Sequence, residues 1–155
     1  MISQTVEYAL RAMTYLAGLE PGATASSAVI AQSTRVPQGY LSKVLRDLVV
    51  AELISSQRGP NGGFSLARAP ALIYVLEVVS AVDPIPRIRR CPLGNPQHRA
   101  LCPLHRRLDD ALAEIELGFS KTSLTDLVES DSRARQCQHL TPGSADSTRI
   151  DPAKK

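Results

Sequence analysis

Apolar residues recur at helical spacing in two segments near the start of the chain. The first predicted helix covers residues 3–19, and a shorter one covers residues 26–33. A serine at the start of the second segment can accept hydrogen bonds from the first backbone N–H groups and so cap that helix. We expect Val29 and Ile30 to be its inward residues.

A third predicted helix is followed directly by a hairpin. The helix covers residues 37–51, and Pro37 fits its first position, where a missing N–H costs nothing. Its apolar stripe consists of Leu41, Val44, Leu45 and Leu48. Residues 53–57 and 64–67 are typical of two short strands, and the turn between them is rich in glycine.

Further helices are predicted in the second half of the chain. One covers residues 72–82, a long one covers residues 104–119, and a short one covers residues 123–128. The stripe of the long helix consists of Leu108, Ala111, Leu112 and Ile115. Beyond residue 129 the chain is rich in Ser, Arg, Gln and Asp without apolar periodicity, so we expect a disordered tail.

These changes of pattern divide the chain into four parts. Prolines and arginines dominate the region before the long helix, and no acidic residue lies between Asp83 and Asp109. The expected parts are a helical unit with a hairpin over 1–83, a cysteine-containing segment over 84–103, the long-helix region over 104–129 and a tail over 130–155.

Composition narrows the class of protein. The 155 residues are 43% hydrophobic and 4% aromatic, which suits one domain with an aliphatic core. No apolar run approaches the roughly 20 residues of a membrane span, and no signal-peptide pattern is present, so we expect a cytoplasmic protein without a membrane partner. The sequence has no phosphate-binding glycine loop and no nucleophile elbow, so an enzyme is not expected.

The order of elements is typical of a winged helix–turn–helix, a mostly α fold with a small β-hairpin wing. In that fold the third helix enters the major groove of double-stranded DNA and the wing touches the backbone or minor groove. A polar face on one helix could simply be solvated, but a glycine-tipped hairpin directly after it favours DNA binding. The expected DNA contacts are Gln38, Ser42, Lys43, Arg46, Arg58, Asn61 and Gly62.

The cysteines are a second candidate site. Three cysteines in a cytoplasmic chain argue against a disulfide framework. Cys91, Cys102 and His105 have the side chains of a metal or iron–sulfur site, because thiolates and imidazoles are the usual ligands. Two plain thiols are an equally good interpretation, and a zinc site lacks an obvious fourth ligand. Cys137 lies in the tail, where we assign it no role.

Several motifs carry a family resemblance. The run EYALRA at residues 7–12 resembles the first helix of the IscR/NsrR/CymR family of bacterial regulators, and RGPNGGFSLA at 58–67 looks like the wing signature of that family. Val36-Pro37 and the run VVSAV at 78–82 are also similar. The resemblance covers about residues 2–130.

The resemblance implies a homodimeric winged-helix transcription factor that binds palindromic operators through these elements. It makes residues 84–103 a sensor loop and the helix after it a long C-terminal dimerisation helix. Glu52 departs from the pattern, because family members commonly have glycine between the third helix and the wing.

The resemblance also bears on the cysteines. Cluster-binding members hold iron–sulfur in this loop with three cysteines, of which Cys91 and Cys102 match the outer two and the middle one is missing. His105 matches a histidine ligand, and Glu7 stands where some members place an acidic ligand from the partner subunit. These four ligands suit a [2Fe-2S] cluster better than a four-iron one, although His98 could compete.

Two functional hypotheses follow. The first is a dimeric DNA-binding regulator that senses redox state, nitric oxide or iron–sulfur status through the Cys/His loop. The alternative is a cluster-free winged-helix repressor or a protein–protein adaptor of the same family, because such members also exist.

Overall fold

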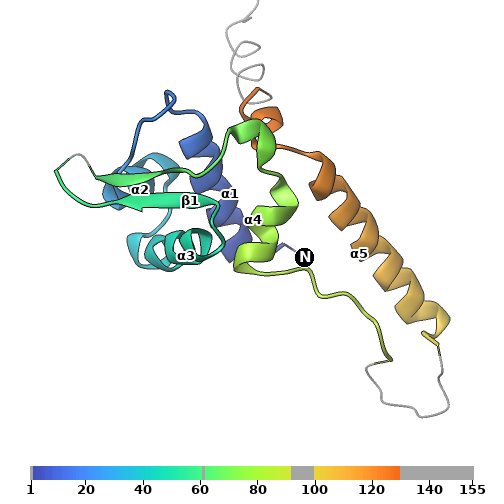
Figure 1. The fold of residues 1–155 in the computed structure, drawn as a ribbon. Coiled ribbons are helices and arrows are strands. Elements are labelled where there is room, and N and C mark those ends of the chain that lie inside the picture. Colours follow the sequence, from blue (N-terminus) through green and yellow to red (C-terminus); the bar gives the residue numbers. More distant parts are fainter. Residues whose placement is uncertain (1, 61, 92–99, 130–155) are drawn as a thin grey trace, which may run out of the picture.

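The computed structural model describes residues 2–60, 62–91 and 100–129. The chain is mostly helical, with one antiparallel hairpin (Figure 1). The elements are α1 Gln4–Ala17, α2 Ser27–Thr34, α3 Gln38–Val50, β1 Ile54–Gln57, β2 Gly63–Leu66, the 3-10 turn η1 Pro70–Leu72, α4 Val75–Val82 and α5 Pro103–Lys121. Residues 124–129 are also helical. The expected tail and Cys137 lie outside the described residues.

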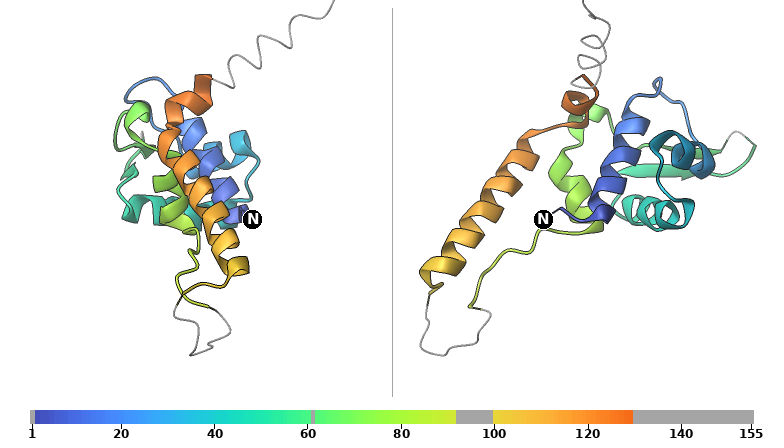
Figure 2. Two further views of the ribbon diagram at one scale, coloured as in Figure 1. Left: turned by 90° about the vertical axis from the view of Figure 1, so that its right-hand side faces the viewer. Right: turned by 180° about the vertical axis from the view of Figure 1, so that it is seen from behind.

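The core is formed by α1–α4 and the hairpin, together with Leu124 from the segment after α5. Helix α1 packs against α2, α3 and α4, and the hairpin closes the unit. Its largest fully buried side chains are Met13, Ile30, Leu41, Leu45, Leu48, Leu53, Ile54, Ile73 and Leu124. Helix α5 contributes no buried residue and lies beside α4, on the opposite side of the unit from α3 and the hairpin (Figure 2).

The structure confirms one of the two core residues expected on α2. Ser26 is the N-cap and accepts a hydrogen bond of 3.3 Å from the Val29 N–H. Ile30 is fully buried, but Val29 is 44% exposed, so its inward prediction is wrong. Adjacent residues on a helix point about 100° apart, and this short helix buries only one narrow face.

The turn between α2 and α3 depends on one left-handed residue. Arg35 has a φ of 55° at the C-cap of α2, and the following Val36 is buried. Pro37 is the N-cap of α3 rather than its first helical residue. The expected stripe of α3 is confirmed, because all four of its residues are at most 2% exposed: Leu41, Val44, Leu45 and Leu48.

The hairpin is joined to α3 by a second left-handed residue. Glu52 has a φ of 57°, so the turn keeps the conformation that glycine favours even though glycine is absent. Strands β1 and β2 pair from Ile54 with Leu66 to Gln57 with Gly63. A side chain at Gly62 would collide with the carbonyl oxygen of Gln57, which requires glycine at this position.

The long helix is tied back to the core at its C-terminal end. The expected helix over 72–82 begins only at Val75, because residues 73–75 pair with residues 122–124 instead. Val75 N donates to the Thr122 carbonyl at 2.9 Å, and Leu124 N donates to the Ile73 carbonyl at 3.0 Å. Within the described residues, no helix is long and apolar enough to cross a membrane.

Burial along α3 gives a direct test of the packing. Val44 is 2% exposed and Val50 is 78% exposed on the same helix. We expect Val44→Ala to lower the free energy of unfolding by about 2 kcal/mol, because it removes two buried methyl groups and leaves a cavity. Urea denaturation at one protein concentration measures this loss. The matched change Val50→Ala should cost little, and equal losses in both variants would refute the orientation of α3.

Candidate DNA-binding surface and cysteine–histidine cluster

The polar face of α3 points to solvent. Gln38, Ser42 and Arg46 follow one another at intervals of four residues, so they line one face of the helix, with Lys43 beside them. All four side chains are exposed. The Ser42 hydroxyl donates to the Gln38 carbonyl at 3.0 Å, which leaves its oxygen free to accept a hydrogen bond.

The hairpin adjoins this face. A hollow between α3 and the strands is lined on one side by Ser42 and Arg46 and on the other by Ser56 and Phe64. Arg58 is exposed directly after β1, and Gly62 is half-buried. The helix face and the wing therefore form one continuous surface. Asn61, the remaining expected contact, lies outside the described residues.

The sequence reasoning missed Ser27, which belongs to this surface, and Arg35, which lies in the turn that leads into α3. Ser27, the first residue of α2, lines the same hollow. Arg35 is an exposed cation in the turn between α2 and α3. The signal that could have identified them is their place in the helix–turn–helix, because a helix N-terminus and the turn beside it are natural phosphate contacts.

The cysteine–histidine cluster lies at the N-terminus of α5. Cys102 is the N-cap of this helix, and His105 follows three residues later. The His105 Nδ1 atom is 3.2 Å from the Cys102 Sγ atom and 3.9 Å from the Cys91 Sγ atom. All three residues are half-buried. The structure thus brings together three of the four expected ligands.

These distances suit a tetrahedral metal. Such an ion, bound to a thiolate and an imidazole, would hold sulfur and nitrogen about 3.5 Å apart. The two observed separations, 3.2 and 3.9 Å, fall on either side of that value. The thiols and the imidazole thus have the right chemistry for a metal or cluster, but within the described ranges no group of three or more ligands is arranged around one point.

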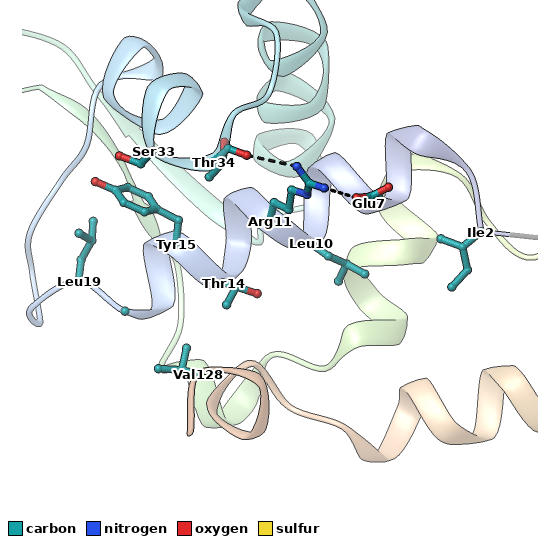
Figure 3. Close-up of a pocket in the computed structure, with 11 residues that line it drawn as sticks. Ile2, Glu7, Leu10, Arg11, Thr14, Tyr15, Leu19, Ser33, Thr34 and Val128 are labelled. Carbon is teal, nitrogen blue, oxygen red and sulfur yellow. Dashed lines mark hydrogen bonds and ion pairs between the residues drawn. The ribbon is translucent and has the colours of Figure 1, made fainter. Parts of the chain in front are cut away.

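Glu7, the fourth expected ligand, lies elsewhere in the same chain. It sits on α1, where its carboxylate forms an ion pair with Arg11 (Figure 3). Arg11 also donates to the Thr34 carbonyl at 3.4 Å, which ties α1 to the end of α2. These groups line an open pocket on the outer face of α1 that also includes Leu10 and Tyr15.

An ion-pair network attaches the segment before Cys91 to α5. The Arg87 guanidinium donates two hydrogen bonds of 2.7 Å to Asp109 and one of 2.8 Å to Glu116. The Ile88 N–H donates to Asp109 at 2.8 Å. The hydrogen bonds from Arg87 lower the pKa of the Asp109 carboxyl most, and the Ile88 N–H lowers it further, to about 2.

A family comparison identifies the chain. The Rrf2 model, described as an iron-dependent transcriptional regulator, matches residues 2–130. The chain belongs to the Rrf2 family. It is therefore a transcriptional regulator of the DNA-binding class, which agrees with the surface formed by α3 and the wing.

Relatives and solved structures agree with this assignment. A protein of Aquifex aeolicus (strain VF5), named as an HTH-type transcriptional regulator, is 29% identical over 153 residues, which cover 93% of this chain and 99% of that protein. Protein ORF2 of Azotobacter vinelandii, with the same kind of name, is 34% identical over 123 residues, covering 78% and 74%.

Two solved structures confirm the winged-helix fold. CymR (YrzC), the global cysteine regulator of B. subtilis, has a TM-score of 0.67 at 28% identity and covers 84% of this chain and 97% of its own. T. potens IscR has a TM-score of 0.73 at 22% identity, covering 87% and 90%. The resemblance inferred from residues 7–12 and 58–67 is confirmed at the level of family and fold.

The Asp109 network predicts a pH-dependent stability. Because the folded pKa of Asp109, about 2, lies below its ordinary value, its contribution is complete above about pH 4 and is lost as the pH falls toward 2. We expect Asp109→Asn to be less stable than the parent near neutral pH, with the gap closing in that acidic window. Thermal unfolding across pH measures the gap. Asp110→Asn removes a charge from the same turn as a control, and a gap that stays constant with pH would contradict the assignment.

Proposed function

We propose that this Rrf2-family regulator acts as a homodimer on a palindromic DNA operator in the cytoplasm, and that an iron–sulfur cluster at the Cys/His loop controls its binding. The observation that carries the DNA part is the single surface formed by the exposed face of α3 and the wing. The cluster part is supported by the convergence of Cys91 and Cys102 on the imidazole of His105.

Residues of α3 and the wing would make different kinds of contact with DNA. Gln38 and Ser42 carry groups that hydrogen-bond base edges in the major groove. Lys43 and Arg46 supply positive charge for phosphates or for guanine, and Arg58 at the wing would reach the backbone or minor groove. Phosphate contacts set the affinity and position, while base contacts select the sequence.

Helix α5 supports the dimer. Three apolar side chains on one face of this helix are 42–64% exposed: Leu104, Leu108 and Ile115. A groove between α5 and the α1–α4 unit is lined by further apolar residues, among them Val6, Val79 and Leu112. A second copy of α5 would cover this surface, because large contiguous apolar patches seldom stay exposed.

The dimer would also complete the ligand set. Cys91, Cys102 and His105 of one protomer would hold the cluster, with the fourth position taken by the partner's Glu7. A bound iron–sulfur cluster would supply a state that changes with redox conditions or nitric oxide. Glu7 would have to leave Arg11 to serve as a ligand, so loading would alter contacts on α1, next to the end of α2.

Control of DNA binding would then be a shift between two arrangements of the dimer. The loaded loop of one protomer would pack against α1 of the other and fix the spacing of the two α3 helices. An operator with matching half-site spacing would bind the loaded and the empty dimer with different affinity.

The cluster-free alternative rests on two observations. The middle cysteine of the cluster-binding pattern is missing, and within the described residues the three candidate ligands do not yet surround one point. A repressor or adaptor that uses the two thiols directly, or not at all, would keep the same DNA-binding surface.

Substitution of single lysines by alanine tests the DNA interface. We expect Lys43→Ala to weaken operator binding. A plot of the logarithm of the affinity against the logarithm of the salt concentration should also become less steep, by about one unit of slope for each phosphate that the protein no longer neutralises. Lys121→Ala, on the opposite side of the molecule at the end of α5, is the matched control. Fluorescence anisotropy with a labelled operator over a salt series gives both numbers, and equal slopes for the two variants would reject α3 as the DNA-binding helix.

The cluster is tested by colour. We expect anaerobically purified protein to absorb visible light and to contain iron and acid-labile sulfide. Cys102→Ser should bleach this absorption, whereas Cys137→Ser, in the tail, should leave it unchanged. A colourless parent protein would favour the cluster-free alternative, and a coloured Cys102→Ser variant would reject Cys102 as a ligand.

A further inference from the structure

Two of the three grouped donors are placed by α5 alone. Cys102 is its N-cap and His105 lies three residues further, so the helix itself fixes their separation. The Cys102 carbonyl accepts the Arg106 N–H at 2.9 Å, which anchors this first turn. Cys91 differs, because it arrives from a non-helical segment that follows α4. Something other than helix geometry must therefore bring it to the imidazole.

The segment from 84 to 91 has few attachments. Ile85 packs against the small apolar cluster formed by Val6, Val75 and Val79. Beyond it, the hydrogen bonds that join this segment to α5 in the described part of the chain are those of Arg87 and Ile88, together with the Cys91–His105 contact itself. The attachment nearest to Cys91 is thus made to Asp109.

The spacing of this attachment matches the reach that Cys91 requires. Asp109 lies four residues, or about 6 Å along the helix, from His105 on the same face. Ile88 lies three residues from Cys91, a span of at most about 10 Å. If the attachments of both Arg87 and Ile88 were broken, the next anchor would be Ile85, and the reach would double to about 20 Å. Cys91 would then sample a much larger volume around the imidazole.

The geometry of the Arg87 side chain suits it to this role. Its Nε and one terminal nitrogen bind both oxygens of Asp109, while the other terminal nitrogen binds Glu116. This fork fixes the Asp109 carboxylate so that the same oxygen can also accept the Ile88 N–H. A lysine has one charged nitrogen and cannot hold both carboxylates in this planar arrangement.

We propose that the Arg87–Asp109 pair is the positioning device of the Cys/His site: it locks the segment before Cys91 in register with α5 and so delivers the Cys91 thiol to His105 and Cys102. The pair touches no ligand atom and acts through the backbone of Ile88. Its effect on a cluster rests on the function proposed above, but its effect on the approach of the two thiols does not.

The test measures thiol proximity in the metal-free, reduced, full-length protein. A Cys137→Ser background leaves only Cys91 and Cys102, and dibromobimane becomes strongly fluorescent when it bridges two nearby thiols. We expect Asp109→Asn to slow bridging within one chain several-fold, while the reaction of each thiol with a monofunctional reagent keeps its rate. A denaturing gel separates bridging within one chain from bridging between chains.

Two further variants make the result specific. Asp110→Asn, one residue away and exposed, should bridge at the parent rate. Arg87→Lys should give an intermediate rate and keep the far-ultraviolet circular dichroism of the parent, so the test does not depend on the folding of one variant. Parent-like bridging in both Asp109→Asn and Arg87→Lys would overturn the proposal.

A metal titration distinguishes failure of the positioning role from failure of the cluster function. With Co²⁺ as the probe, removal of the Asp109 charge should weaken binding by roughly 10–100-fold, the usual effect of a residue that orients metal ligands. If the parent protein binds neither Co²⁺ nor a cluster but Asp109→Asn still slows bridging, the cluster function fails and the positioning role stands. If the parent loads normally and the bridging rates are equal, the positioning role fails and the cluster function stands.

Discussion

Burial of one stripe of α3 determines which side chains can reach DNA. Leu41, Val44, Leu45 and Leu48 are each at most 2% exposed. Rotating the helix to hide its polar face would expose all four, at a cost on the order of 6–12 kcal/mol from the hydrophobic effect alone. The line of Gln38, Ser42 and Arg46 is therefore held outward beside the wing, whatever happens at the other end of the molecule.

The parts of the fold with strong periodicity could be predicted from the sequence. The stripe of α3, the N-cap of α2 and the glycine-tipped hairpin all follow from local rules that one segment satisfies by itself. The prediction for Val29 is wrong because α2 contacts the core along a narrow face. That face includes Ile30 but not the residue before it. The predicted start of α4 is wrong because residues 73–75 pair with residues 122–124, an interaction between distant segments that periodicity does not reveal.

The two candidate sites differ in the same way. The DNA-binding face could be identified because its residues follow one helix and the hairpin after it. The approach of Cys102 to His105 could also be predicted, since both belong to one turn. The position of Cys91 could not, because it depends on Arg87 and Asp109, which are 22 positions apart in the chain. Arginines in a loop next to cysteines suggest positive charge beside the thiols. Arg87 instead attaches the loop to α5 through Asp109.

Helix α5 links the two ends of the proposed mechanism. Its C-terminal end is bound to the core through Val75 and Leu124, and its N-terminal end carries Cys102 and His105. None of its side chains is fully buried within its own protomer, so much of its surface is available to a second copy, although Phe119 packs against the cluster of Val6, Val75 and Val79. A dimer built on this helix would convert a change at the cysteines into a change in the distance between two recognition helices.

The most direct test of this account is selection of DNA from a random-sequence pool by the full-length protein, followed by hydroxyl-radical footprinting of the selected sites. The account predicts inverted repeats whose two patches of protected backbone lie a whole number of helical turns apart, and weaker protection of both patches by Lys43→Ala at the same protein concentration. Recovery of no common sequence, or protection of a single patch by one protomer, would contradict it.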